Sequence, residues 1–392
     1  MKDDFIEAAR QATAEDRVLN RRTTSLFHRD ISKKPAARLP GSKVSVNRIS
    51  LIEETLSRPD LFIPSTPAFF WEPVTVDLEE TNPTPHVQEL LETVWGKFLT
   101  THKTEKAVLR LTSTLHDRLF TSLYSDTEID MVTETSWLVY RSLWDMVGLP
   151  TAWLGKVDFN VPINTLKSIS GVRKRNKKQL ETFQISQSKA KLLFLDRLVR
   201  TNYREGNPEN LAGFMKQEGF SELETTTVLK TLFVSEVQPA LNFLPRLTAL
   251  LIKTRYLTRL NASPELTSQV IEEAFRVTNP VPPPHMVATA PYTFNGLKVQ
   301  PQDTVMLNFA AAAVEEGIFN PDTPKLYNVF DMYAKCDKML ELKTPWVQQL
   351  STVTAEVLKE AWDEDVLSIT QQSSDDKSYS GGYKELRVKW VS

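Results

Sequence analysis

Apolar residues recur at helical spacing along most of this chain. Segments whose apolar positions follow at intervals of three and four residues predict amphipathic helices. These segments are residues 3–18, 49–56, 86–100, 105–124, 128–147, 187–203, 208–218, 222–254, 264–277 and 344–362. The pattern therefore predicts a mainly helical protein.

The segment 222–254 differs from the others because it is apolar on more than one face and contains Pro239 and Pro245. A helix that is apolar all round is usually buried in the centre of a large protein. A proline inside a helix bends it and frees a backbone carbonyl. We therefore predict a kinked central helix in this segment.

The pattern changes near the carboxyl end. Residues 285–308 alternate between apolar and polar positions and contain Asn295-Gly296, a pair typical of two-residue β-hairpins. A second hairpin is predicted in the tail, at 379–390. The sequence thus adds a small β region to the helical part.

Two segments interrupt the helical pattern earlier in the chain. Residues 29–44 contain prolines and a glycine and are interpreted as a surface connection. Residues 62–85 contain five prolines and several aromatic residues. Long irregular segments of this kind in compact domains are often binding loops.

The chain has 392 residues, of which 41% are hydrophobic, and this is enough for a sizeable core. Length alone permits two or three domains as well as one. We expect a single domain over residues 1–392, helix-rich over 1–280, β-containing over 281–343, and closed by a helix and a hairpin over 344–392.

The net charge of −2 implies no general attraction to nucleic acid or to an anionic membrane. No stretch approaches 18 uninterrupted apolar residues, and the first residues are charged. The sequence therefore predicts a soluble, cytoplasmic protein without signal peptide or membrane anchor. The basic run 173–178 is either a solvated surface or a docking site for an acidic partner.

Cys336 is the only cysteine, so no intramolecular disulfide can form, which fits a reducing compartment. The five histidines show no HxxxH or HExxH spacing, and no CxxC is present. A zinc site built by the protein alone is not predicted.

The segment 272–319 carries a run of short motifs in a fixed order. They are Glu273-Ala274-Phe275-Arg276, Asn279-Pro280-Val281-Pro282, Ala288-Thr289, Phe294-Asn295-Gly296 with the residues up to Val305, and Asn308-Phe309-Ala310-Ala311-Ala312 before Phe319. This run resembles, without gaps, the cytochrome P-450 superfamily, especially its soluble bacterial-type members. The resemblance extends more weakly over nearly the whole chain, and it implies the cytochrome P-450 fold.

Glu273 and Arg276 match the ExxR element of that family, where the two side chains satisfy each other in the protein interior. A buried pair of this kind is costly to break. The alternative is a pair on a helix surface, since the residues are three positions apart.

The resemblance also implies a haem whose iron is bound by a cysteine thiolate in a loop of the form FxxGxxxC. Here the corresponding stretch 330–339 contains no glycine. The sequence from Phe319 to Cys336 also has fewer residues than the same segment of the family. Cys336 is therefore either the iron ligand or a thiol beside a deleted loop. Alignment with the helix that follows puts Met332 near the ligand position instead.

The residues that hold the haem propionates and deliver protons in the family are also changed. His86 keeps the histidine of the HxxxR element while its arginine is lost, and His285 lies near the position of a second lost arginine. Both histidines could hold the propionates or be simple polar contacts. Glu236 stands one position before the family's acid, about 100° away around a helix, and Gln238 and Pro239 could line a pocket instead.

These losses predict a cytochrome P-450-like protein that binds no haem and activates no dioxygen. It would bind or act on a hydrophobic small molecule of natural-product or lipid metabolism, as a non-redox cyclase or isomerase using Glu236, Gln238 and His285. It could equally be an accessory protein of a glycosyltransferase or another biosynthetic enzyme.

Two alternatives stay open at this point. One is a haem-thiolate enzyme that uses Cys336 for peroxide-dependent or rearrangement chemistry, with haem as its cofactor. The other is a conventional monooxygenase fed by ferredoxin. The aromatic residues of the long irregular segment, together with Trp95, indicate either an apolar ligand or packing within the loop; those in the segment are Phe62, Phe69, Phe70 and Trp71.

Overall fold

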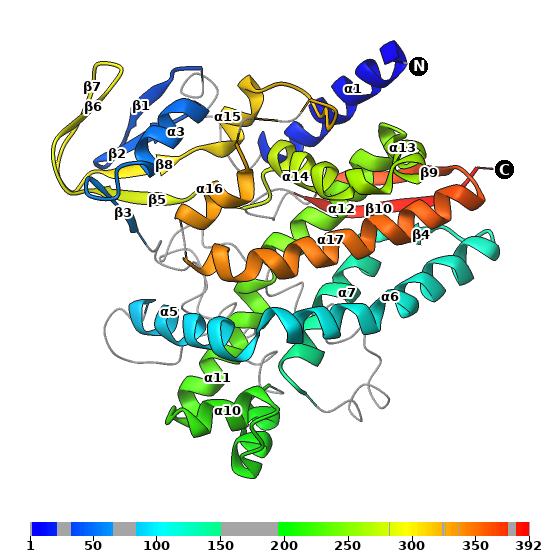
Figure 1. Cartoon of the computed structure of the whole chain (residues 1–392), viewed down its shortest axis with the longest axis horizontal. Coiled ribbons are helices and arrows are strands. Elements are labelled where there is room, and N and C mark those ends of the chain that lie inside the picture. Colours follow the sequence, from blue (N-terminus) through cyan, green and yellow to red (C-terminus); the bar gives the residue numbers. More distant parts are fainter. Residues whose placement is uncertain are drawn as a thin grey trace.

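A computed structural model describes residues 2–21, 33–65, 84–149, 195–281, 283–323, 325, 327–336, 338–374 and 382–391 (Figure 1). The predicted basic run 173–178 and the aromatic residues Phe69, Phe70 and Trp71 lie outside these residues.

Helices form most of the described structure, and α12 (Gln238–Lys253) runs through its middle. It contacts α17 (Lys338–Glu364), α7 (Met131–Met146), α14 (Thr267–Thr278) and α1 (Lys2–Arg21). Nearly every side chain of α12 is buried, polar residues included. The prediction of a buried central helix is confirmed.

The predicted helix 222–254 is divided into three parts. α11 (Glu222–Thr231) begins at a capping box formed by Ser221 and Glu224. A π-helical turn, η3 (Leu232–Glu236), follows it, and α12 starts two residues later. Pro239 lies in the first turn of α12, where its missing N–H is not needed.

In the part of the chain that the structure describes, the β region consists of three small sheets. The five-stranded sheet has the order β1 (Ala36–Leu39), β2 (Lys43–Val46), β8 (Thr304–Leu307), β5 (His285–Ala288) and β3 (Phe62–Ser65). β6 (Tyr292–Phe294) and β7 (Leu297–Val299) form a hairpin. Asn295 and Gly296 make its turn with φ of 43° and 82°, as the sequence predicted.

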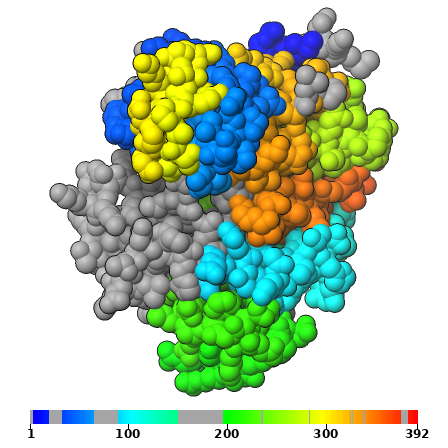
Figure 2. All heavy atoms as spheres, turned by 60° about the vertical axis from the view of Figure 1, so that its left-hand side comes forward, coloured from blue at the N-terminus to red at the C-terminus, as the bar shows by residue number. Residues whose placement is uncertain are grey.

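A hairpin lies at the predicted tail, but its first strand comes before the predicted range 379–390. β9 (Leu367–Ser374) pairs with β10 (Tyr383–Trp390), and β10 pairs on its other side with β4 (Ile129–Asp130). The five-stranded sheet and its hairpin form one end of the molecule, and the helices around 195–236 form the opposite end (Figure 2).

Three interpretations of irregular structure were wrong. Residues 29–44 include β1 and part of β2, and residues 62–65 form β3. β2 runs parallel to β8, which lies some 260 residues later in the chain. The local sequence pattern therefore does not predict β2 as a strand. The stretch expected to hold a ligand loop is instead α16 (Val329–Cys336).

Most of the remaining helices agree with the predicted segments to within a few residues. They are α3 (Ile49–Leu56), α5 (Thr84–Thr93), η1 (Val94–Phe98), α6 (Thr101–Tyr124), α10 (Leu211–Gln217) and η4 (Pro264–Leu266). Two further helices, α13 (Tyr256–Ala262) and α15 (Phe309–Glu315), were not predicted. No helix in the described part of the chain is both long and apolar enough to span a membrane.

Candidate functional site

A buried ion pair joins the start of the central helix to α17. The Lys343 ammonium lies 2.8 Å from Oε2 of Glu236. Glu236 is 2% exposed and Lys343 is 7% exposed, so the pair is shielded from water. Charged groups are almost never this buried unless they are paired. The pair therefore fixes η3 against α17 in the interior.

Aromatic side chains surround this part of α17. Trp346 follows Lys343 by one helical turn, so both side chains lie on one face of α17. The Trp95 ring lies 5.8 Å from the Trp346 ring, and both are buried. The Trp346 indole N–H donates to Oγ of Ser142 on α7. The contact of Lys343 with Glu236 and that of Trp346 with Trp95 thus lie one helical turn apart on α17, which they join to η3 and η1.

Two of the four residues come from π-helical turns. Trp95 lies in η1, and Glu236 is the last residue of η3. The predicted orientation of Glu236 assumed α-helical geometry, with a rotation of about 100° per residue. That assumption was wrong, because the turn that ends at Glu236 is π-helical.

The Glu273–Arg276 pair is buried and bidentate. Arg276 donates from Nε and Nη2 to the two carboxylate oxygens of Glu273, at 2.6 and 2.7 Å. Both side chains are at most 6% exposed. Arg276 also donates to the carbonyls of Ala313 and Ile318, and Glu273 accepts from the backbone N–H of Asn320. The pair ties α14 to the chain segment after α15.

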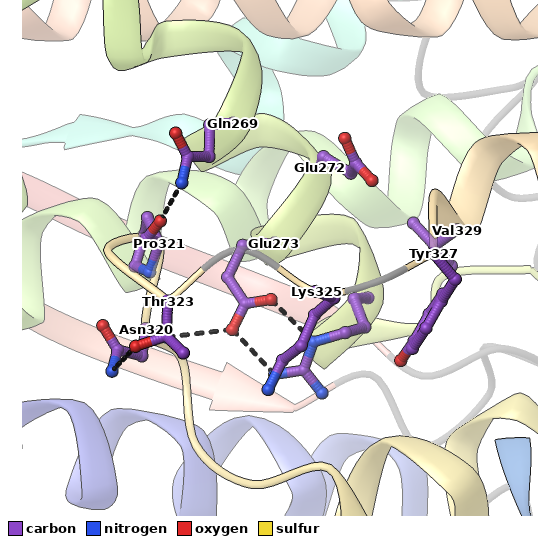
Figure 3. Close-up of a pocket in the computed structure, with 10 residues that line it drawn as sticks. Gln269, Glu272, Glu273, Asn320, Pro321, Thr323, Lys325, Tyr327 and Val329 are labelled. Carbon is purple, nitrogen blue, oxygen red and sulfur yellow. Dashed lines mark hydrogen bonds and ion pairs between the residues drawn. The ribbon is translucent and has the colours of Figure 1, made fainter.

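A cavity of about 80 Å³ lies beside this pair (Figure 3). Gln269 closes one side by donating to the Pro321 carbonyl, and the Asn320 amide donates to Thr323. Lys325 donates to the carbonyl of Glu316. Gln269, Asn320 and Lys325 are thus engaged with neighbouring groups, and they support the chain over 316–323.

Two titratable groups of this cavity are shifted by their surroundings. Burial, with smaller contributions from Asp331 and Glu273, raises the pKa of Glu272 against the lowering effect of a backbone hydrogen bond. Burial is also the main cause that raises the pKa of Tyr327. Both shifts favour the neutral forms of these side chains.

Cys336 does not lie in a loop. It is the last residue of α16, is buried, and its Sγ donates to the Met332 carbonyl at 3.1 Å. α16 packs against α17, α14 and α3. The expectation that the stretch 330–339 is a degraded loop was wrong, because its apolar residues form a buried helix face with Phe330, Met332 and Tyr333.

The aromatic face of α16 is part of the core. The Phe330 ring lies 4.3 Å from Phe275, and the Tyr333 ring lies 4.3 Å from Phe309. The Tyr333 hydroxyl donates to Oδ1 of Asn279. Burial raises the pKa of Tyr333 well above its ordinary value, so the hydroxyl keeps its proton.

The other predicted site residues are separated. Gln238 begins α12 and is half-buried. His285 begins β5 in the five-stranded sheet, where burial, and to a lesser extent the charge of Lys43, lowers its pKa. His86 lies in α5, with its side chain outside the described part. Gln238 follows Glu236 by two residues, whereas His285 lies on a separate element, so a joint role of the three residues stays a prediction.

Lys343 was not foreseen as a functional residue. A signal for it exists in the sequence, because Lys343 occupies the apolar stripe that continues through Trp346, Val347 and Leu350. A charged residue on such a stripe needs a buried partner. Among the described residues, no three His, Cys, Asp or Glu side chains gather as metal ligands.

Similar proteins were found by comparison with solved structures, and not by comparison of sequences. No protein-family model matches the chain, and no curated protein matches it by sequence. A cytochrome P-450 from Bacillus megaterium in complex with testosterone is similar at 16% identity and TM-score 0.68, over 93% of this chain and 97% of that chain.

Two further solved structures are similar over nearly their whole length. The P-450 BioI in complex with acyl carrier protein carrying hexadec-9Z-enoic acid has 13% identity and TM-score 0.72, over 95% of this chain and all (100%) of that chain. A monooxygenase involved in teicoplanin biosynthesis has 15% identity and TM-score 0.70, over 93% and 96% of the two chains. The chain has the cytochrome P-450 fold.

Proposed function

We propose that this chain is a cytochrome P-450-fold protein that works without haem and binds an apolar small molecule for a reaction that needs no dioxygen. The Lys343–Glu236 ion pair carries the proposal. In the haem-thiolate chemistry implied by the fold, the thiolate holds one face of the iron and the proton-delivering residues of the central helix serve the other. The haem must therefore lie between the ligand segment and that helix.

The residues present do not fit a haem in that place. A ring between two groups needs a contact of about 3.5 Å on each face, so such groups are roughly 7 Å apart. Here the Glu236 carboxylate and the Lys343 ammonium are 2.8 Å apart. The pair thus occupies space between the central helix and the start of α17 with its own direct contact.

The thiol geometry supports the same proposal. An iron ligand must be a thiolate that projects from the backbone toward the metal. The Cys336 thiol instead donates to the carbonyl four residues earlier, inside its own helix. No glycine turn brings the backbone of 329–336 toward a macrocycle, because these residues are helical.

The ligand class is proposed from the similar structures and from the aromatic surroundings of the pair. One of those structures is in complex with testosterone, one with hexadec-9Z-enoic acid on acyl carrier protein, and the third enzyme is involved in teicoplanin biosynthesis. Mostly apolar walls with a few polar groups are usual in small-molecule sites. A molecule of natural-product or lipid metabolism fits these features.

An absorbance spectrum tests the proposal. The protein is produced with a haem precursor in the medium, purified, and then titrated with hemin. We expect no stoichiometric Soret band, and the same result for the Cys336→Ser variant. A stoichiometric band in the unmodified protein that is lost in Cys336→Ser would overturn the proposal and establish the haem-thiolate alternative.

A further inference from the structure

Three irregular helical turns meet at one buried place. η1 supplies Trp95 and η3 supplies Glu236, and α17 contains Pro345 between Lys343 and Trp346. π-helical turns are rare and are frequently found at functional sites. A proline inside a helix removes one backbone hydrogen bond. Three such irregular features on neighbouring elements favour a functional site over ordinary core packing.

Two buried side chains that donate hydrogen bonds, Lys343 and Trp95, lie on or against α17 at this place. A lysine ammonium has three N–H donors, and the contact recorded for Lys343 in the described part of the chain is the one with Glu236. The Trp95 indole N–H is buried and has no hydrogen-bond partner among the described residues. Its ring lies against the face of α17 that carries Lys343. An unpaired buried donor is costly, so these groups suit a ligand oxygen.

Electrostatics select the kind of oxygen. Glu236 already neutralises Lys343, so a ligand carboxylate would leave a net negative charge away from water. A neutral carbonyl oxygen accepts the same hydrogen bonds and adds no charge. The indole rings of Trp95 and Trp346 and the ring of Phe233 in η3 are buried apolar surfaces. The site therefore suits an apolar molecule with a neutral carbonyl group.

We propose that Lys343 and Trp95 bind the carbonyl oxygen of an apolar ketone or similar compound, and that Glu236 transfers a proton at the adjacent carbon. This inference rests on the haem-free function proposed above. The Glu236 carboxylate takes the proton, the C–H bonding electrons move into the enolate, and Lys343 and Trp95 stabilise the enolate oxygen. The protonated Glu236 then returns the proton to the same carbon or to a conjugated one. No oxidant or reductant is required.

The test uses the full-length protein with testosterone and a long-chain methyl ketone as neutral carbonyl probes and hexadecenoic acid as the carboxylate probe. Binding is measured by equilibrium dialysis, and proton transfer by deuterium uptake next to the carbonyl in deuterated buffer. We expect at least one ketone to bind more tightly than the acid and to take up deuterium faster than without protein.

The variants separate binding from proton transfer. Trp95→Phe keeps an aromatic ring without the N–H, and it should weaken ketone binding by up to roughly tenfold. Trp362→Phe, which removes an indole N–H bonded to Thr258, is the matched control. It should leave ketone binding and deuterium uptake unchanged. Glu236→Gln should slow deuterium uptake by about 100-fold or more. It should also reduce the preference for ketones over hexadecenoic acid, because Lys343 loses its counter-charge.

The outcomes are distinct from those of the haem test. Tighter binding of hexadecenoic acid than of either ketone overturns the inference, and so does ketone binding that Trp95→Phe leaves unchanged. Absence of deuterium uptake by a haem-free protein that binds ketones overturns the proton-transfer step and leaves the proposed function intact. If Glu236→Gln does not fold, as circular dichroism would reveal, Trp95→Phe alone decides the binding step, and deuterium uptake by the unmodified protein decides the chemistry.

Discussion

At the scale of single residues, the buried charged side chains are the ones whose substitution should most affect the stability of the fold. Burying an ion pair costs desolvation that the mutual attraction only partly returns, and removing one partner leaves the other charge uncompensated. Glu236 and Lys343 form such a pair, 107 residues apart in sequence. Replacing only one of the two residues should therefore lower the free energy of unfolding more than replacing both.

Lys343→Met should lower the free energy of unfolding by about 3–5 kcal/mol, because the Glu236 carboxylate then stays buried without its partner. Lys343→Met combined with Glu236→Leu should recover most of that loss, since both charges are gone. Urea denaturation measures both effects. Lys338→Met, which breaks an exposed pair with Glu341, is the control and should leave the midpoint unchanged. A double variant no more stable than the single one would contradict this account.

His285 should make stability depend on pH. Its folded-state pKa lies below the ordinary value of 6.5, because burial and Lys43 disfavour the charged form. The unfolded chain then binds more protons in this range, so stability is complete above about pH 6.5 and falls as the pH is lowered through that value.

Replacing His285 by Gln should flatten the free energy of unfolding between about pH 7 and 5, measured by urea denaturation at each pH. The matched control is His102→Gln at an exposed position of α6, which should keep the slope of the unmodified protein. An unchanged slope in His285→Gln would show that other groups cause the pH dependence.

Single residues also show which contacts the sequence does not predict. Glu236 was singled out from its place in the central helix, but its partner could not be named, because no pattern relates it to Lys343. The π-helical turn before α12 was likewise invisible, since periodicity assumes regular helices. Glu273 and Arg276 were easier, because three-residue spacing on one helix brings them together.

At the scale of elements, helices were predictable where their apolar faces are regular. α3, α6 and α17 follow from residue spacing alone. β1 and β2 did not, because four-residue strands gain their stability from partners distant in sequence. α16 was obscured by the expectation of a ligand loop, although its spacing of apolar residues is helical.

The anchoring of α1 is a prediction at this scale. Asp16 on α1 accepts from Arg246 of α12, with Nε to Oδ1 at 2.8 Å, and both side chains are at most 3% exposed. Asp16→Ala should cost about 3–5 kcal/mol, because it leaves Arg246 charged in the core. Amide hydrogen exchange of α1 should accelerate as well, since the helix loses its buried attachment.

The control for α1 is Glu7→Ala, which removes the exposed ion pair with Arg10 on the same helix. This variant should leave the unfolding midpoint and the exchange of α1 unchanged, since exposed pairs contribute little. Equal acceleration of exchange in both variants would mean that α1 is not held by Asp16.

At the scale of the whole molecule, the chain shares its fold with solved cytochrome P-450 structures. The likeness to solved cytochrome P-450 structures covers more than nine-tenths of the chain. Among the described residues, a buried ion pair joins η3 to α17, and the tilted rings of Trp95 and Trp346 pack η1 against α17. Elements far apart in sequence are thus joined here by the protein's own side chains.

The group that stabilises the folded chain should therefore be an apolar ligand. A ligand that binds only the folded state adds about 2.7 kcal/mol to the free energy of unfolding at one hundred times its Kd. Testosterone or the long-chain methyl ketone should raise the melting temperature in this concentration-dependent way, whereas hemin should not. Lys343→Met should abolish the ketone effect, because the carbonyl loses its charged donor. A rise with hemin and none with either ketone would assign the interior of this fold to haem.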